Sequence, residues 1–290
     1  MTNDVTREIS YAQCGATRVG RTIIRGLENA TGRVGLIRRG AGYENDVAQG
    51  RDFWRVMMAR YGLSLEVIAG SLADIPKHGP LLMVANHPFG ILDGLMMGHI
   101  LSEVRDDFRI LAHNVFKKAE VLDRIVLPIS FEDTKAALQL NLNTRNQALN
   151  FLKQGGALGV FPGGTVSTSA RPFGAPLDPE WRSFTARMIA KSDAQVVPVY
   201  FEGTNSRMFQ IASHMHSSLR LGLLIREFGK RVDTPVRVVI GKPVPRDDLA
   251  TFGGESKGLM DFLRRRTYEL SPRPLPESGY GFEFEEKRRA

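Results

Sequence analysis

Residues 81–101 read LLMVANHPFGILDGLMMGHIL, and this stretch decides the fold. Five apolar residues lead to a polar pair and a Pro-Phe-Gly turn signal, and residues 94–101 then have the composition of a helix. The stretch is long enough to cross a bilayer, but Asn86, His87 and Asp93 lie near its middle, where hydrocarbon penalises polar groups. We therefore expect a core strand, a loop and a helix.

Similar apolar runs, rich in β-branched residues, recur along the chain and predict further strands. Helical patterns lie between them, the clearest at residues 133–156, with Asp133 and Thr134 as cap candidates and two glycines as its stop. This alternation predicts an α/β fold, a single domain with a mixed, largely parallel central sheet flanked by helices. The predicted strands are residues 81–85, 108–112, 125–130, 157–161, 196–201 and 236–240.

The chain divides into three parts by composition. Residues 51–272 carry the strand and helix patterns and are expected to form the main folded domain, whereas residues 273–290 form a tail rich in Pro, Gly and charge. Residues 1–50 lack strand signals and mix arginines with aliphatic residues, which suits either an anionic lipid interface or a solvated basic face. No signal peptide or transit sequence is evident at the start, so a cytoplasmic protein is expected.

Charge and cysteine content limit the function classes. The formal net charge of +8 favours anionic partners, which include nucleic acids, acidic membrane surfaces and acidic small substrates. Cys14 is the single cysteine, so the chain has neither an intramolecular disulfide framework nor a thiolate metal cluster. The histidines lack metal-ligand spacing, so no metal is expected.

His87 and Asp93 are candidates for acid–base chemistry. Residues six apart on a regular helix point about 240° away from each other, so the intervening turn is needed to bring them together. If Asp93 lies in the first turn of the following helix, its carboxylate reaches one imidazole nitrogen and leaves the other free to remove a proton from an attacking hydroxyl. A His and an Asp with this spacing more often have a structural role, so a catalytic role needs support from other parts of the sequence.

Four blocks in order support the chemical interpretation. Asn86-His87 followed by Asp93 resembles the first motif of the glycerolipid acyltransferases, the family of bacterial 1-acylglycerol-3-phosphate acyltransferase. The segment FKK at 116–118, FPGGTVS at 161–167 and VPVYFEG at 197–203 are similar to the family's later blocks. The resemblance implies an acyltransferase with His87 as general base oriented by Asp93. It also implies substrate contacts at Asn86, Lys117, Gly163, Gly164 and Thr165.

Two departures from the family pattern bear on the acceptor. Five residues separate His87 from Asp93, an HX5D form that resembles the hemolysin-like and ornithine-lipid-type branch. In the third block, Gly163 and Val166 stand where FPEGTRS has Glu and Arg. The resemblance therefore implies an acceptor other than simple lysophosphatidic acid. The N–H groups of Gly163 and Gly164 could face a phosphate or an oxyanion, although a tight turn explains these glycines equally well.

The expected activity is transfer of a fatty acyl group from acyl carrier protein or coenzyme A to the hydroxyl of a lysolipid, either a lyso-aminolipid of ornithine-lipid type or a lysophospholipid. No cofactor is expected beyond the acyl thioester substrate. The enzyme is expected to associate peripherally with the inner face of the cell membrane and not to bind nucleic acid. Residues 205–231 alternate apolar and basic residues and fit either a membrane-facing or a core-facing helix. The alternative is a noncatalytic lipid-binding protein that retains the fold.

Overall fold

A central sheet organises the molecule. The computed structural model describes residues 10–15, 17–113, 120–130, 134–275 and 279–284. Seven strands form one sheet: β1 (Ser64–Ala69), β2 (Leu81–Ala85), β3 (Phe108–His113), β4 (Val126–Ile129), β5 (Ala157–Val160), β8 (Gln195–Phe201) and β9 (Pro235–Ile240). Their order is β1-β9-β8-β2-β5-β3-β4. A separate antiparallel pair consists of β6 (Thr168–Ser169) and β7 (Pro176–Leu177).

The strand directions confirm the predicted α/β fold with a mixed, largely parallel sheet. Every neighbouring pair in the large sheet is parallel except β8 with β9, which is antiparallel. Each of the six apolar runs forms a strand. The edge strand β1 was not among the predictions, and its residues are half-buried or exposed.

The middle strand β2 is buried on both faces, which explains its unbroken run of apolar residues. Successive side chains of a strand point to opposite faces. Leu81, Met83 and Ala85 accordingly join one hydrophobic core, and Leu82 and Val84 join another.

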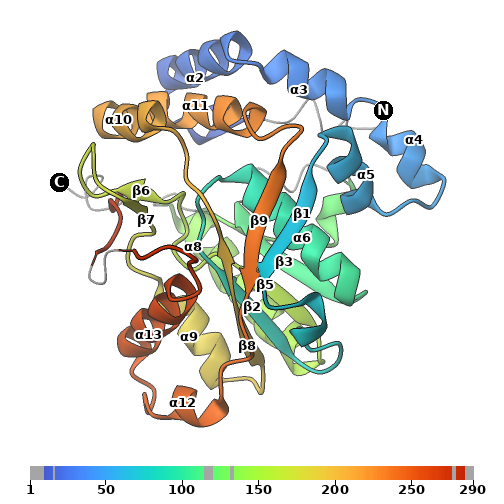
Figure 1. Ribbon diagram of the computed structural model, residues 1–290, viewed down its shortest axis with the longest axis vertical. Coiled ribbons are helices and arrows are strands. Elements are labelled where there is room, and N and C mark those ends of the chain that lie inside the picture. The colour runs from blue at the N-terminus through green and yellow to red at the C-terminus, as the bar shows by residue number, and fades with distance from the viewer. Residues whose placement is uncertain (1–9, 16, 114–119, 131–133, 276–278, 285–290) are drawn as a thin grey trace.

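Helices cover both faces of this sheet (Figure 1). The core around Met83 includes α5 (Phe53–Arg60) and α6 (Ile91–Val104). The core around Val84 includes α8 (Lys135–Lys153), α9 (Ser183–Ala190) and α13 (Ser256–Tyr268). The remaining helices are η1 (Ala12–Cys14), α2 (Arg18–Ala30), α3 (Arg33–Gly40), α4 (Tyr43–Ala48), η2 (Leu72–Asp74), α7 (Glu120–Asp123), α10 (Arg207–Met215), α11 (Ser217–Gly229) and α12 (Arg246–Ala250).

The predicted helix in residues 133–156 is confirmed as α8. Its N-cap is Thr134, whose hydroxyl accepts the N–H of Ala137 at 3.1 Å. The other cap candidate, Asp133, lies outside the described residues.

Two helices of the N-terminal segment, α2 and α3, lie beside α11, in the layer at the top of Figure 1. Ile24 of α2 is fully buried. Glu28, also fully buried, accepts hydrogen bonds from the Ser10 hydroxyl and the Tyr11 N–H, both at 2.6 Å. Within the described residues, no helix combines the length and the apolar character needed to cross a membrane.

Residues 205–231 contain two helices, α10 and α11, instead of one amphipathic helix. The apolar residues of this segment are divided between the protein interior and its surface. Phe209, Leu224 and Ile225 are buried in the protein, whereas Met208 and Ile211 are exposed. The core-facing alternative holds for the first three of these residues.

Candidate active site

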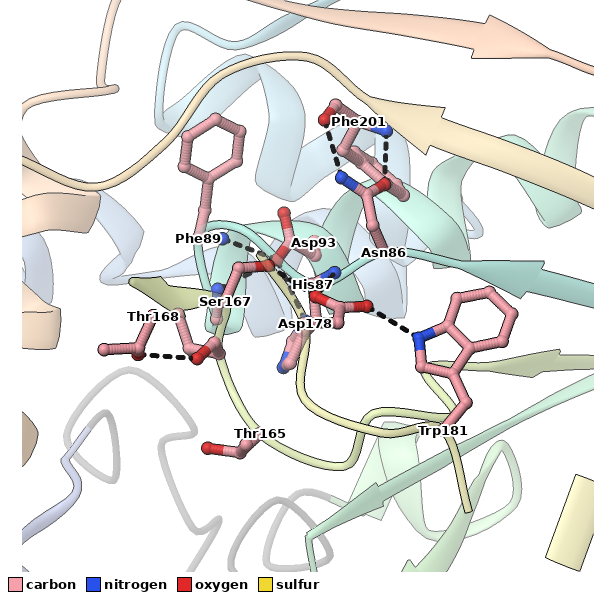
Figure 2. Close-up of polar contacts among 12 residues, drawn as sticks. Asn86, His87, Phe89, Asp93, Thr165, Ser167, Thr168, Asp178, Trp181 and Phe201 are labelled. Carbon is pink, nitrogen blue, oxygen red and sulfur yellow. Dashed lines mark hydrogen bonds and ion pairs between the residues drawn. The ribbon is translucent and has the colours of Figure 1, made fainter. Parts of the chain in front are cut away.

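The candidate site lies where three parallel strands end. β2, β5 and β8 are neighbours, so their carboxyl ends meet at one edge of the sheet, the position at which open α/β sheets bind ligands. β2 leads into Asn86 and His87, and β5 leads into the loop at residues 161–167. Figure 2 shows the polar contacts that join these segments.

The side chains of His87 and Asp93 lie in contact, as expected from the turn between them. The Nδ1 atom of His87 lies 2.9 Å from Oδ2 of Asp93. The two atoms are close enough for a hydrogen bond, but the ring N–H does not point straight at the oxygen, so the contact is not a well-aligned one. Apo sites often show such loose alignment, which tightens when substrate binds.

Asp93 occupies the first turn of α6. Its Oδ2 atom accepts the backbone N–H groups of Phe89 at 2.7 Å and Gly90 at 2.9 Å, so the carboxylate caps the helix that carries it. The residue is fully buried, and this burial is the main cause that raises the pKa of Asp93; His87 and the two N–H groups oppose the rise.

Gly90 makes this turn possible. Its backbone has φ 93° and ψ −119°, a conformation that only glycine adopts readily. An added Cβ atom would also lie 3.0 Å from the Tyr11 hydroxyl. The Pro-Phe-Gly segment therefore holds Asp93 close to His87.

The imidazole of His87 is held on two sides. Asp93 lies at Nδ1, and the ring stacks on Phe161 with 4.4 Å between ring centroids. The side chain keeps 18% of its surface exposed, whereas Asp93 has none. This arrangement leaves Nε2 as the nitrogen that can exchange a proton with a substrate.

Asp178 is a site residue that sequence reasoning missed. Its Oδ1 atom accepts the backbone N–H of His87 at 3.1 Å and the Ser167 hydroxyl at 2.5 Å, and its Oδ2 atom accepts Nε1 of Trp181 at 2.9 Å. The carboxylate is completely buried and joins the end of β2 to the loop after β5. No local pattern signals this role, because the contact with His87 spans 91 positions of sequence.

Asn86 joins two strand ends. Its Nδ2 donates to the carbonyl of Phe201 at 2.9 Å, and its Oδ1 accepts the N–H of the same residue at 2.7 Å. Both ends of the amide are thus used in holding β2 to β8. The expected substrate contact of Asn86 stays a prediction.

The other candidate substrate-binding residues occupy the loop after β5, apart from Lys117, which lies outside the described residues. Gly164 has φ 67°, and its N–H donates to the Phe161 carbonyl at 3.0 Å, so this N–H is used by the turn itself. Gly163 packs beside Asp178, whose Cβ lies 3.3 Å from the position of an added Cβ. Thr165 accepts a hydrogen bond from Arg220 at 2.9 Å.

Metal binding has no cluster to support it in the described part of the chain. No group of three or more His, Cys, Asp or Glu residues there has a geometry that could hold an ion. The absence of a metal remains an expectation from sequence.

Comparisons with known proteins agree with the family resemblance of the sequence. A family model described as Acyltransferase matches residues 47–273. A lyso-glycine lipid O-acyltransferase from Phocaeicola vulgatus is 26% identical over 210 residues, covering 68% of this chain and 70% of that protein. A protein of the same name from Bacteroides thetaiotaomicron is 27% identical over 210 residues, covering 68% and 71%.

One solved structure gives a weaker match. The crystal structure of the 1-acyl-sn-glycerophosphate acyltransferase PlsC from Thermotoga maritima aligns with a TM-score of 0.45 and 18% sequence identity. The alignment covers 78% of this chain and 86% of that one.

Proposed function

The chain belongs to the acyltransferase family, and on that basis we propose that it transfers a fatty acyl group from a thioester donor to the hydroxyl of a lysolipid. The observation that carries this proposal is the contact of 2.9 Å between His87 Nδ1 and the buried carboxylate of Asp93. This contact occupies Nδ1 and leaves Nε2 of the partly exposed His87 side chain for an approaching hydroxyl.

The proposed reaction needs no nucleophile from the protein. Nε2 of His87 removes the proton of the acceptor hydroxyl as its oxygen attacks the thioester carbonyl. The tetrahedral intermediate then expels the thiolate, which takes the proton from the imidazolium, leaving an ester and a free thiol. Asp93 keeps the proton of the imidazole on Nδ1 and stabilises the imidazolium while it exists. No resident cofactor is proposed.

The oxyanion requires donors near the same edge of the sheet. The N–H of Gly164 is committed to Phe161, so Gly163 is the member of the glycine pair whose N–H we propose for this task. The contact between Gly163 and Asp178 would keep that N–H in a fixed orientation.

The acceptor is proposed to be a lyso-aminolipid in preference to a lysophosphatidic acid. Both relatives carry names that specify a lyso-glycine lipid acceptor. Gly163 and Val166 also leave the loop after β5 without the charges of FPEGTRS. The donor is acyl carrier protein or coenzyme A, and the net charge of +8 suits either anionic carrier.

An anionic membrane surface is the proposed place of action. The helical layer formed by α2, α3, α10 and α11 exposes aliphatic side chains beside exposed arginines, the combination that binds acidic bilayers. We expect the protein to float with vesicles that contain acidic phospholipid at low salt and to be released at high salt, whereas zwitterionic vesicles should bind weakly. The exposed aliphatic residues are Val19, Ile23, Val34, Met208, Ile211 and Met215.

The activity is tested with purified protein, labelled acyl carrier protein or coenzyme A donors and a panel of lysolipids. His87→Ala should lower transfer by about 10²–10⁴-fold. His99→Ala is the matched control, because His99 lies on α6 beside Glu103, away from the candidate site. Equal turnover by the wild type and His87→Ala would remove the proposed base. Lipid binding without turnover would instead favour the noncatalytic alternative.

A further inference from the structure

A buried guanidinium lies beside the loop that follows β5. It belongs to Arg220 of α11, which has 5% of its surface exposed. Burial lowers the pKa of Arg220 to about 10, so the group still carries its charge at neutral pH.

A single nitrogen of Arg220 makes all its hydrogen bonds to the described residues. Nη2 donates to the Thr165 hydroxyl at 2.9 Å, to the Val166 carbonyl at 2.8 Å and to the Thr168 hydroxyl at 3.3 Å. The ring of Phe284 lies 4.2 Å from the guanidinium carbon. Among the residues that the structure describes, none accepts a hydrogen bond from Nε or Nη1.

Arg105 shows how the same molecule satisfies a buried arginine that serves structure. It is also 5% exposed, but Asp107 binds its Nε at 2.7 Å and its Nη2 at 2.8 Å. Carbonyl oxygens of Pro76, Gly79 and Gly155 accept its remaining N–H groups. All three nitrogens of Arg105 therefore have partners.

Arg220 also differs from Arg105 in that no carboxylate of the described residues neutralises its charge. The described residues give Arg220 no ion pair with a carboxylate, and the one side chain among them that raises its pKa is the Tyr11 phenol. A buried charge without a counterion is costly, and planar anions such as carboxylate and phosphate match the guanidinium fork. The residues that the structure describes thus supply no carboxylate to Arg220, which leaves its Nε and Nη1 free to bind an anion from a ligand.

The position of Arg220 connects it to the candidate active site. Thr165 and Val166, which it holds, come directly before Ser167, and the N–H of Ser167 donates to the carbonyl of His87 at 2.8 Å. The same short loop therefore contacts both the buried cation and the proposed base. An anion bound to Arg220 would therefore lie beside the loop that also contacts the backbone of the proposed base.

We propose that Arg220 binds the anionic group of the acceptor headgroup, a carboxylate or a phosphate, and so selects charged lysolipids. This inference rests on the proposed function and assigns the headgroup class that the sequence left open. Arg220 supplies positive charge to the loop from α11, although the loop's own sequence has lost its charged residues.

Arg220→Gln tests the proposal in matched acceptor pairs. One pair is a lyso-glycine lipid and its methyl amide, and the other is lysophosphatidic acid and monoacylglycerol. In the pair that contains the natural type of acceptor, Arg220→Gln should raise KM for the charged lipid by roughly 10- to 100-fold. KM for the neutral lipid of that pair should change by less than about 3-fold. The pair in which Arg220→Gln removes the difference in KM between the charged and the neutral acceptor shows whether Arg220 binds a carboxylate or a phosphate. Arg220→Lys, which keeps the charge without the fork, should be intermediate.

Arg226→Gln is the matched control, since it removes a positive charge from α11 at a more exposed site. It should leave the acceptor ratios unchanged. A purely structural Arg220 would lower transfer to charged and neutral acceptors in parallel, and that result would overturn the proposal. If Arg220→Gln instead lowered transfer from coenzyme A thioesters but not from pantetheine thioesters, the anion bound by Arg220 would belong to the donor. That result would also overturn the proposal.

Binding without turnover separates this proposal from the proposed function. N-palmitoylglycine lacks an acceptor hydroxyl, so its affinity relative to its methyl amide can be measured in detergent by calorimetry whether or not the protein transfers acyl groups. Wild type should prefer the free acid, and Arg220→Gln should lose this preference, with N-palmitoyl ethanolamine phosphate as the phosphate counterpart. Lack of any preference for an anion in the wild type would refute the role of Arg220, even if acyl transfer is demonstrated.

Discussion

Asp178 Oδ1 accepts the backbone N–H of His87 at 3.1 Å, which fixes the end of β2 to a residue 91 positions later in the chain. The same carboxylate also binds Ser167 and Trp181. We interpret Asp178 as a positioning residue, because its contacts act on the backbone of the proposed base and not on its imidazole.

Asp178→Asn should therefore lower kcat by about 10-fold or more, because misplacement of a catalytic group by a fraction of an ångström is costly. The reason is the number of donors around the side chain. Three donors point at Asp178, and an amide offers one oxygen, so its NH₂ group must face either Trp181 or the pair formed by His87 and Ser167. Steady-state kinetics and thermal unfolding would measure both effects.

The double variant Asp178→Asn/Trp181→Phe provides a conservative rescue. Removal of the indole N–H lets the amide nitrogen occupy the Trp181 side while its oxygen keeps the His87 and Ser167 contacts. We expect the double variant to recover kcat relative to Asp178→Asn alone. Failure of this recovery, with both proteins folded, would argue that the negative charge of Asp178 is what matters.

Asp93→Asn should separate activity from stability. Transfer should fall on the order of 10²–10⁴-fold, because the amide no longer stabilises a charged imidazolium. Stability should be maintained or increased by on the order of 1 kcal/mol, because the substitution removes a buried charge whose Oδ1 has no partner within the described structure. Glu103→Gln on the same helix, at an exposed ion pair with Arg55, is the control and should retain activity.

The stability difference between Asp93→Asn and wild type should depend on pH in one direction. Burial raises the pKa of Asp93, so the folded protein holds this proton more tightly than the unfolded chain does. Wild-type stability from this group is therefore lost as pH rises from the ordinary aspartate pKa through the raised value. Across that pH interval, the unfolding free energy of Asp93→Asn should increase relative to that of the wild type, and above the interval the difference should stay constant. Denaturant unfolding at several pH values would measure this difference. An advantage that shrinks with rising pH would contradict the direction of the shift.

Gly90→Ala should damage both folding and turnover. The positive φ of 93° strains any L-residue, and the new Cβ would lie 3.0 Å from the Tyr11 hydroxyl. We expect a loss of about 1–3 kcal/mol in unfolding free energy. The control is Gly94→Ala, in the helix, where an added Cβ meets nothing within 4 Å and should stabilise α6 by about 0.5–1 kcal/mol.

Much of the fold could be predicted because its main elements are marked locally. β2 is apolar throughout since both faces are buried, and α8 begins at Thr134 since a hydroxyl there caps the helix. Asp93 was expected to reach His87 because Pro and Gly in the spacer imply a turn. The half-exposed edge strand β1 has no such signal and was missed.

The surroundings of the site could not be predicted, because they depend on contacts between distant segments. Asp178 lies in a short polar stretch with no distinctive spacing, and only the folded chain places it under His87. Arg220 is likewise 54 residues from the carbonyl of Val166 that it binds. In sequence, the loop after β5 has lost its charge; in three dimensions, a guanidinium from α11 lies against it.

Gly163→Glu tests whether that loop can simply regain the residue found in FPEGTRS. An added Cβ at this position would lie 3.3 Å from Cβ of Asp178 and 3.4 Å from its Oδ2, so the new carboxylate must displace Asp178 or be repelled by it. We expect a lower melting temperature and a fall in transfer to every acceptor, charged or neutral. Gly163→Ala should be milder, since the neighbouring atoms need to move by only a few tenths of an ångström. If Gly163→Glu instead gained activity toward lysophosphatidic acid, the space beside Asp178 would have to be open to substrate, and the packing explanation for this glycine would be wrong.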